Sequence, residues 1–263
     1  MDKTSIFGIF LGIIAIGVGM VLKGVSITAL FNPAALLIIF LGTFAAVCIA
    51  FPLSALKKVP ALLKIIFTEE ESKDIKQLIN KFTQWAELSR REGLLALENE
   101  VGEINDPFLS SGLQLAIDGQ SNEFIQDVML EKVDAMEGRH QKGASIFTQA
   151  GTYAPTLGVL GAVIGLIAAL GDLNDIDALG KAISAAFIAT LFGIFSGYVL
   201  WHPFANKLRE KSKNEVLIKQ IIIEGVLSLT NGDPPQVIQD KLGSYLSQKE
   251  LLKVGQEEEK ETA

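Results

Sequence analysis

Every charged side chain of this 263-residue chain lies outside four long blocks of sequence. The 23 Lys and Arg and the 30 Asp and Glu residues are absent from residues 4–22, 24–56, 143–171 and 182–206. A helix that crosses a bilayer needs about 17–25 predominantly apolar residues, and each block is long enough. This segregation predicts a polytopic membrane protein and excludes a disordered or collagen-like chain.

The composition excludes several other classes of protein. Cys48 is the only cysteine, so no intrachain disulfide can form. Two His and one Cys without clustered spacing do not make a zinc site, and no Ser/His/Asp set or glycine-rich phosphate loop indicates an enzyme. We therefore expect no metal, no cofactor and no enzymatic activity. The net charge of −7, with no basic domain, gives no reason to expect a nucleic-acid partner.

The first block has to be distinguished from a secretory signal. Its apolar run, residues 6–22, is longer than the roughly 7–15-residue core of a signal peptide, and its small-x-small triplets lie inside that run. We expect an uncleaved helix. In the second block Asn32-Pro33 reads as a turn into a helix, and Pro52 with Ser54 marks the far end. The predicted membrane helices are residues 5–22, 33–51, 152–170 and 182–201.

Lys and Arg are concentrated on one side of these four helices. Three Lys follow the second helix, Arg139 and Lys142 precede the third, and a basic run begins at Lys207 after the fourth. The other two connections are short and carry one Lys each. The positive-inside rule then predicts that both termini are cytoplasmic in a multi-pass protein of the cell membrane. The predicted division is residues 1–53 and 146–206 in the membrane, with 54–145 and 207–263 in the cytoplasm.

The cytoplasmic segments show a helical pattern without strand-like alternation. Apolar residues recur at three- and four-residue spacing from Ile75 to Trp85 and again from Phe124 to Met136. Ser121 is a candidate N-cap, and no proline follows it until Pro155. We expect an all-α protein in which the third and fourth membrane helices extend into the cytoplasm and residues 54–145 form a helical domain.

Small residues recur along the third and fourth membrane helices. At this spacing they let helix backbones approach closely, which is a common packing device in lipid. Two interpretations are open, because such residues hold together either the four helices of one chain or neighbouring subunits. The residues are Gly161 and Gly165 in the third helix and Ala185, Ala189, Gly193 and Gly197 in the fourth.

Two further pairs of residues match in depth. Counting at about 1.5 Å per residue from the outer ends places Ala162 and Thr190 at one level near mid-membrane, with Pro155 and Pro203 toward the cytoplasm. Each proline deprives the carbonyl four residues earlier of its donor, so the prolines mark either simple kinks or water-lined hinges.

A carboxylate inside a span is the usual mark of an ion pathway, because the cost of burying it is repaid only by function. None of the four spans contains one. Either this chain conducts nothing, or a second protein brings the carboxylate to a wall that this chain provides. Composition and spacing alone therefore indicate a four-helix membrane protein with a helical cytoplasmic domain.

Sequence motifs indicate a family. Residues 151–166 resemble the third membrane helix of the MotA flagellar stator family, residues 189–198 and 201–208 resemble its fourth helix and cytoplasmic exit, and residues 90–98 resemble its rotor-facing motif. The resemblance spans nearly the whole chain and is nearest to the proton-type members of Gram-positive bacteria. It implies a homopentamer around two MotB chains, whose membrane helices each supply a proton-carrying Asp and which anchor the unit to peptidoglycan.

The resemblance also implies roles for individual residues of the membrane helices. Pro155 and Pro203 match the family's functional prolines, Thr190 the threonine that faces the partner's Asp, and Tyr198 a family tyrosine. Ala162 stands where sodium-driven relatives carry Thr, and a methyl group cannot replace a water ligand of Na⁺. The resemblance therefore favours protons over sodium.

Three charged residues of the cytoplasmic motif match family residues that contact the rotor protein FliG, namely Arg90, Arg91 and Glu98. A purely structural interpretation is also open, because Glu87 and Arg91 are spaced for a surface pair worth about 0.2–0.5 kcal/mol. Rival functions are a sodium-driven stator, an energiser of the TolQ/ExbB group and a non-conducting membrane scaffold. TolQ and ExbB proteins have three membrane helices, whereas this sequence predicts four.

Overall fold

The computed structural model describes residues 2–69, 75–102, 104–171 and 176–246, and within these ranges the secondary structure is helical with no strand. The chain divides into two compact units. One comprises Met1–Glu70 and Arg139–Lys211, and the other comprises Glu71–Gly138 and Ser212–Ala263. The all-α fold class predicted from the sequence is confirmed. The predicted domain boundaries follow the membrane and not the packing, and they stay a prediction.

Four helices of the described residues are long and apolar enough to cross a membrane, and their apolar segments belong to the first unit. They are α1 (Lys3–Leu22), the run Pro33–Ala50, α9 (Asn122–Leu170) and the run Ile176–Thr230. The second run is formed by α2 (Pro33–Leu36), η2 (Leu37–Leu41) and α3 (Gly42–Ala50). The two short helices α4 (Leu53–Leu56) and α5 (Val59–Phe67) follow it. Four membrane helices were predicted, and the residues that the structure describes contain four helices of sufficient length and apolar composition.

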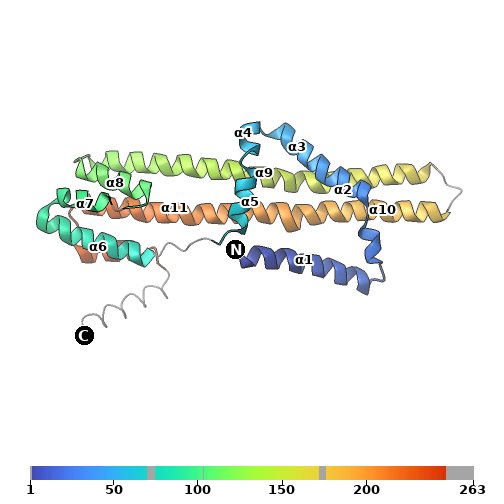
Figure 1. Cartoon of the computed structure of the whole chain (residues 1–263), viewed down its shortest axis with the longest axis horizontal. Helices are drawn as coiled ribbons and strands as arrows, with labels where there is room; N and C mark the ends of the chain where they lie inside the picture. The colour runs from blue at the N-terminus through green and yellow to red at the C-terminus, as the bar shows by residue number, and fades with distance from the viewer. Residues whose placement is uncertain (1, 70–74, 103, 172–175, 247–263) are drawn as a thin grey trace. The chain divides into compact units, whose positions relative to one another are not determined.

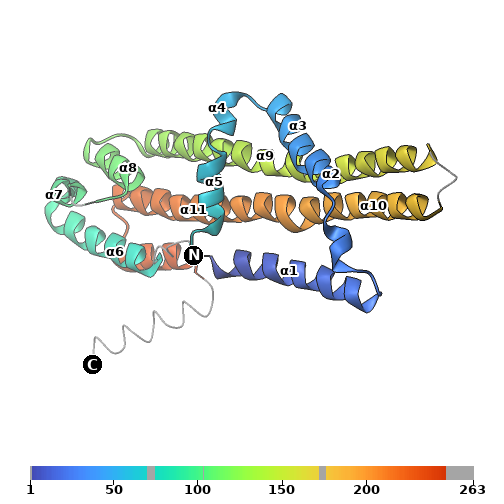
Figure 2. The same ribbon diagram turned by 45° about the vertical axis from the view of Figure 1, so that its right-hand side comes forward.

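The third and fourth membrane helices continue far beyond a bilayer's thickness, as predicted. Helix α9 has 49 residues and includes Pro155 without a break. The run Ile176–Thr230 has 55 residues and consists of α10 (Ile176–Phe195), η4 (Ser196–Trp201) and α11 (His202–Thr230). The C-terminal part of α9 lies beside α10, and α1 lies on the other side of α10 (Figures 1 and 2).

Short polar side chains fix where these helices begin. The Asp2 carboxylate caps α1 by accepting hydrogen bonds from the backbone N–H groups of Thr4 and Ser5, at 3.0 and 3.2 Å. The Asn32 side chain caps α2 by accepting from the N–H of Ala35 at 3.1 Å, directly before Pro33. The predicted cap at Ser121 is also present, because its hydroxyl accepts from the N–H of Phe124.

Many large apolar side chains of the first unit are exposed. They lie on every predicted span, for example Phe7 and Phe10 on α1, Phe44 and Ile49 on α3 and Ile167 on α9. In water an apolar surface of this extent would be costly. In a bilayer these side chains contact lipid tails at no cost, which is the environment that the sequence predicts.

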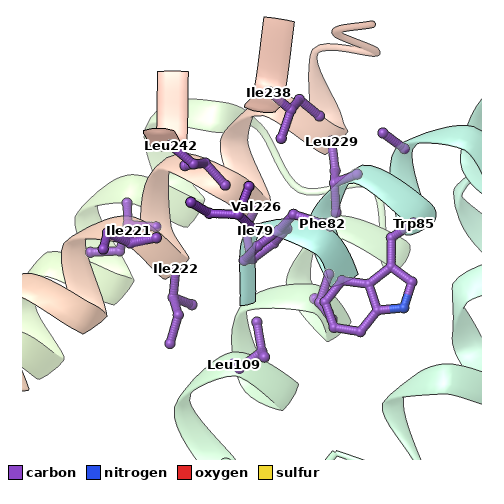
Figure 3. Packing of buried hydrophobic residues seen from close by; sticks show 14 of the residues in the cluster. Ile79, Phe82, Trp85, Leu109, Ile221, Ile222, Val226, Leu229, Ile238 and Leu242 are labelled. Carbon is purple, nitrogen blue, oxygen red and sulfur yellow. The ribbon is translucent and has the colours of Figure 1, made fainter. Parts of the chain in front are cut away.

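The second unit is a helical domain with its own apolar core (Figure 3). Its elements are α6 (Ile75–Glu92), η3 (Leu94–Leu97), α7 (Glu98–Val101), α8 (Pro107–Ile117), α12 (Pro235–Gly243) and the parts of α9 and α11 that belong to it. Phe82 is fully buried and lies against Gly225 of α11, where a Cβ would approach its ring to 2.6 Å. The missing side chain of Gly225 therefore lets α6 and α11 pack closely.

The predicted apolar stripe of α6 is the one that enters this core. Ile79, Phe82 and Trp85 are all buried there, with Phe82 and Trp85 in an edge-to-face contact. On α9 the stripe holds for Ile125 and Val133, but Phe124 is exposed. Residues 124 and 125 are about 100° apart on a helix, so only one of them can face the core.

Candidate functional site

The third and fourth membrane helices touch backbone to backbone. A Cβ built on Gly193 of α10 would lie 2.7 Å from the carbonyl oxygen of Ala154 and 2.8 Å from Cα of Gly158. Real Cβ atoms do not approach backbone so closely, so no side chain larger than hydrogen fits at this contact. Gly158, which the sequence analysis did not single out, faces Gly193 in the same way. Its spacing of three residues from Gly161 was the available signal.

The close packing continues toward the C-terminal end of α9 and the N-terminal end of α10. A Cβ on Gly161 would lie 3.3 Å from that of Ala189, and a Cβ on Gly165 would lie 3.4 Å from that of Ala186. Ala185 is half-buried, and its carbonyl accepts a hydrogen bond from the Asn32 side chain at 3.3 Å. Packing within one chain thus accounts for Gly161, Gly165, Ala189 and Gly193, whereas Ala185 contacts Asn32 through its backbone carbonyl.

Ala162 and Thr190 lie at nearly the same level along the two helices. Each directly follows one member of the Gly161 and Ala189 contact, and because the helices run in opposite directions the two residues are offset by about 3 Å along the axes. Both side chains are half-buried. The Thr190 hydroxyl donates a long hydrogen bond of 3.4 Å to the Ala186 carbonyl of its own helix. Its oxygen lone pairs are left to accept a further hydrogen bond.

The fourth span ends in a π-helix that pattern reasoning did not foresee. In η4 the N–H of His202 donates to the carbonyl of Gly197, five residues earlier. Pro203 follows at once, and a proline cannot supply the usual donor to the carbonyl four residues before it. π-Helical turns inside α-helices are frequent at functional sites. Pro203 was the signal for an irregularity here, although it did not reveal the type.

The π-helix brings Pro155 and Gly197 together. A Cβ on Gly197 would lie 2.8 Å from both the Pro155 ring and the carbonyl oxygen of Gly151. The Gly151 carbonyl is the one that Pro155 leaves without its usual helical donor. The Gly151 carbonyl oxygen therefore faces the π-helix at Gly197, where any residue with a Cβ would clash with it.

Tyr198 and Pro203 line an open groove of about 360 Å³. The opposite wall is the first part of α1, with Thr4, Ser5 and Gly8, and Lys207 also lines the groove. The Tyr198 side chain is 65% exposed, and its ring centroid lies 5.3 Å from that of His202. Two of the predicted pathway residues thus share one groove, whereas Ala162 and Thr190 do not line it.

Asp2 and Lys207 close the end of this groove with an ion pair of 2.5 Å. Asp2 is buried, its backbone N–H donates to the carbonyl of Phe67, and Lys207 also donates to the Thr4 hydroxyl. The hydrogen bond from Lys207, with those from Thr4 and Ser5, holds the pKa of the Asp2 carboxyl well below its usual range, although burial opposes the shift. Asp2 is therefore a permanent anion at any physiological pH.

The rotor-facing residues predicted from the sequence lie together in the second unit. Arg90 and Arg91 lie in the last turn of α6, Gly93 turns the chain with φ 85°, and Glu98 begins α7. The side chains of Arg90, Arg91 and Glu98 are all exposed. Arg91 forms a 3.8 Å ion pair with Glu87, but both side chains are exposed to water, so the pair contributes little to fixing the position of Arg91.

A partly buried hydrogen bond and a buried leucine stabilise this segment. The Trp85 indole N–H donates to the Glu100 carboxylate at 3.1 Å, and Leu97 is fully buried. The backbone that carries Arg90, Arg91 and Glu98 is thus fixed by the packing of Trp85 and Leu97. Within the described ranges no cluster of His, Cys, Asp and Glu is suited to a metal ion.

Known proteins share this sequence and this arrangement of helices. Residues 100–221 match the MotA/TolQ/ExbB proton channel family. Motility protein A of Bacillus subtilis (strain 168) is 61% identical over 259 residues, which cover 98% of this chain and 96% of that protein. The solved structure of the flagellar MotAB stator complex from Bacillus subtilis matches with a TM-score of 0.91 and 62% identity, over 96% of this chain and 99% of that chain.

A more distant structure has the same fold. The structure of C. jejuni MotAB matches with a TM-score of 0.88 and 30% identity, over 94% of this chain and 97% of that chain. The fold is thus retained at 30% identity. Because the identity to Motility protein A extends over nearly the whole of both proteins, this chain belongs to the MotA/TolQ/ExbB proton channel family.

Proposed function

We propose that this chain is a stator subunit of a bacterial flagellar motor. Together with a MotB-type partner it conducts protons through the membrane and converts their flow into torque on the rotor. The observation that carries the proposal is the close-packed wall of α9 and α10, which holds Thr190 and Ala162 at nearly the same level but contains no carboxylate in its spans. The proton-carrying acid therefore has to come from a partner.

The physical basis is a change of charge beside a fixed wall. A partner carboxylate that is alternately ionised and neutral changes its interaction with the Thr190 hydroxyl, which can either donate to it or accept from it. One charge that crosses the membrane releases about 2.3 kcal/mol per 100 mV, which is a few times the thermal energy and sufficient to bias a mechanical step.

Five copies of this chain surround two partner chains in the proposed assembly. The solved relative from Bacillus subtilis is a MotAB stator complex, and this supports a MotB-type partner here. Arg90, Arg91 and Glu98 contact the rotor protein FliG, with both termini of the chain in the cytoplasm. A proton channel is not an enzyme, and we propose no catalysed reaction for this chain.

Protons are proposed over sodium because of Ala162. Its methyl group offers no oxygen to replace a water ligand of a sodium ion. The test is swimming of a strain that carries this chain and its partner as the only stator, in medium without sodium. We expect motility to persist without sodium and to stop when a protonophore is added. Motility that disappears when sodium is removed would show a sodium-driven stator.

A further inference from the structure

A small pocket lies where α4, α5 and α9 meet in the first unit. Its volume is about 160 Å³, several times the ~30 Å³ that one water molecule occupies in the liquid, so a phosphate group fits. Ser54 and Ala55 of α4 form one side and Gly143 and Ile146 of α9 the other. Leu62 of α5 packs against Gly143, where a Cβ would lie only 3.2 Å from its methyl groups. The missing side chain lets α5 and α9 approach at the floor of the pocket.

Three cationic side chains line this pocket, and none of its lining residues in the described part of the chain carries a carboxylate. They are Lys58, which joins α4 to α5, and Arg139 and Lys142 of α9. None of the three has an ion pair with any residue that the structure describes. Like charges at close range destabilise one another. An anion bound between them would remove this repulsion, and the Arg139 guanidinium is shaped to bind two oxygens of one phosphate.

The pocket lies at the level where the apolar spans end. On α9 the charge-free sequence begins at Gly143, the residue after Lys142. On the other side α3 ends at Ala50, and the Leu53 side chain of α4 is 67% exposed. Exposed apolar groups directly beside a cationic pocket mark the boundary between lipid tails and headgroups. With the proposed topology this is the cytoplasmic face, whose leaflet is rich in acidic lipids.

We propose that Lys58, Arg139 and Lys142 bind the phosphate of an acidic phospholipid of the cytoplasmic leaflet. The headgroup joins the α4 and α5 segment to α9 and thereby braces one end of the α9 part that lies in the membrane. This site is independent of the proposed ion pathway, because none of its lining residues belongs to the α10 and η4 wall. It predicts that the protein requires acidic lipid for full stability.

The test is native mass spectrometry of the purified full-length complex with its partner. The complex is delipidated in detergent and then mixed with phosphatidylglycerol, with phosphatidylcholine or with inorganic phosphate. The pocket variant is the double substitution Arg139→Gln and Lys142→Gln. The control is the double substitution Lys57→Gln and Lys64→Gln, which also removes two positive charges near the pocket from residues that do not line it.

The wild-type complex and the control are expected to retain phosphatidylglycerol but not phosphatidylcholine. The pocket variant is expected to bind phosphatidylglycerol about tenfold more weakly, while the single substitution Lys142→Arg, which keeps the charge, is expected to bind it like wild type. Equal binding by the pocket variant and the control would overturn the proposal, as would competition by inorganic phosphate at equal concentration. Loss of the oligomer without loss of lipid would show that a second copy of the chain covers the pocket, and would also overturn it.

Discussion

The carboxylate of Asp2 and the ammonium of Lys207 lie 2.5 Å apart and join the start of the first membrane helix to the helix that leaves the fourth. Asp2 also caps α1 and donates its backbone N–H to Phe67 at the end of α5. Three segments that are distant in the sequence thus meet at one carboxylate. The pair borders the groove that Tyr198 and Pro203 line, so it holds one wall of that groove in place.

Substitution Asp2→Asn is expected to destabilise the complex by about 1–2 kcal/mol, because it leaves the partly buried Lys207 without its anion. The measurement is the midpoint of thermal unfolding in detergent. The matched control is Lys3→Gln, which removes a charge from the adjacent exposed position. An equal loss of stability in both variants would show that the pair has no special role.

The stabilisation by the Asp2 and Lys207 pair depends on pH in a direction that the lowered pKa of Asp2 determines. The pKa of Asp2 is lowered in the folded protein, so the stabilisation is fully present above the unfolded value of about 3.9 and is lost as the pH falls below it. The difference in unfolding midpoint between wild type and Asp2→Asn is therefore expected to be constant from about pH 5 to 8 and to shrink only below about pH 4. If the difference in unfolding midpoint changed between pH 6 and 8, Asp2 would not be the group responsible for it.

Substitution Gly193→Ala is expected to separate α9 and α10, because its Cβ would lie 2.7 Å from the Ala154 carbonyl oxygen. Overpacking of this kind costs about 1–3 kcal/mol, and swimming should fall with it. The measurements are the amount of assembled complex in the membrane and the swimming speed. Gly17→Ala in α1, where nothing lies within 4 Å of a Cβ, is the control and should swim like wild type. Normal assembly of Gly193→Ala would show that the helices can part there without harm.

The sequence predicts the spans well because charge segregation is a local property of the chain. A charged residue within residues 4–22 would oppose insertion of this segment into a bilayer, whatever contacts the segment makes with the rest of the chain. The stripe of small residues was ambiguous for the opposite reason. Whether Gly161 and Gly193 face their own chain or another depends on the path of both helices, which spacing along one helix does not determine.

The features that escaped prediction all depend on contacts between distant segments. The π-helix at Ser196–Trp201 follows from Pro203 together with the packing of Gly197 on Pro155. The Asp2 and Lys207 pair joins residues that are far apart in the sequence. Lys207 begins a basic run, but no sequence pattern links that run to Asp2.

Substitution Thr190→Ala is expected to reduce proton flux and torque strongly while leaving the fold intact. The lost hydroxyl makes only a 3.4 Å hydrogen bond to the Ala186 carbonyl, so the change in stability should stay within about 0.5 kcal/mol. The measurements are swimming and the unfolding midpoint. Thr156→Ala on α9 removes a hydroxyl that bonds its own helix at 2.7 Å and serves as the control. If both variants swim equally well, Thr190 has no role in the pathway.

Charge reversal at Arg90 and Glu98 is expected to abolish torque without loss of the complex, since both side chains are exposed and lie outside the core. The measurement is the speed of tethered cells together with the membrane level of the protein. Lys81→Glu reverses another exposed charge of α6 and should leave torque nearly unchanged. Torque that survives the double reversal with an unaltered rotor would refute rotor contact at these residues.

The central claim is that this chain forms the wall of a proton pathway whose acid belongs to a partner. Proton flux into liposomes under a membrane potential tests it directly, with this chain alone, with the partner, and with a partner whose membrane Asp is changed to Asn. The account predicts flux only when the chain and the unaltered partner are both present. Equal flux from this chain alone, or from the complex with the altered partner, would contradict it.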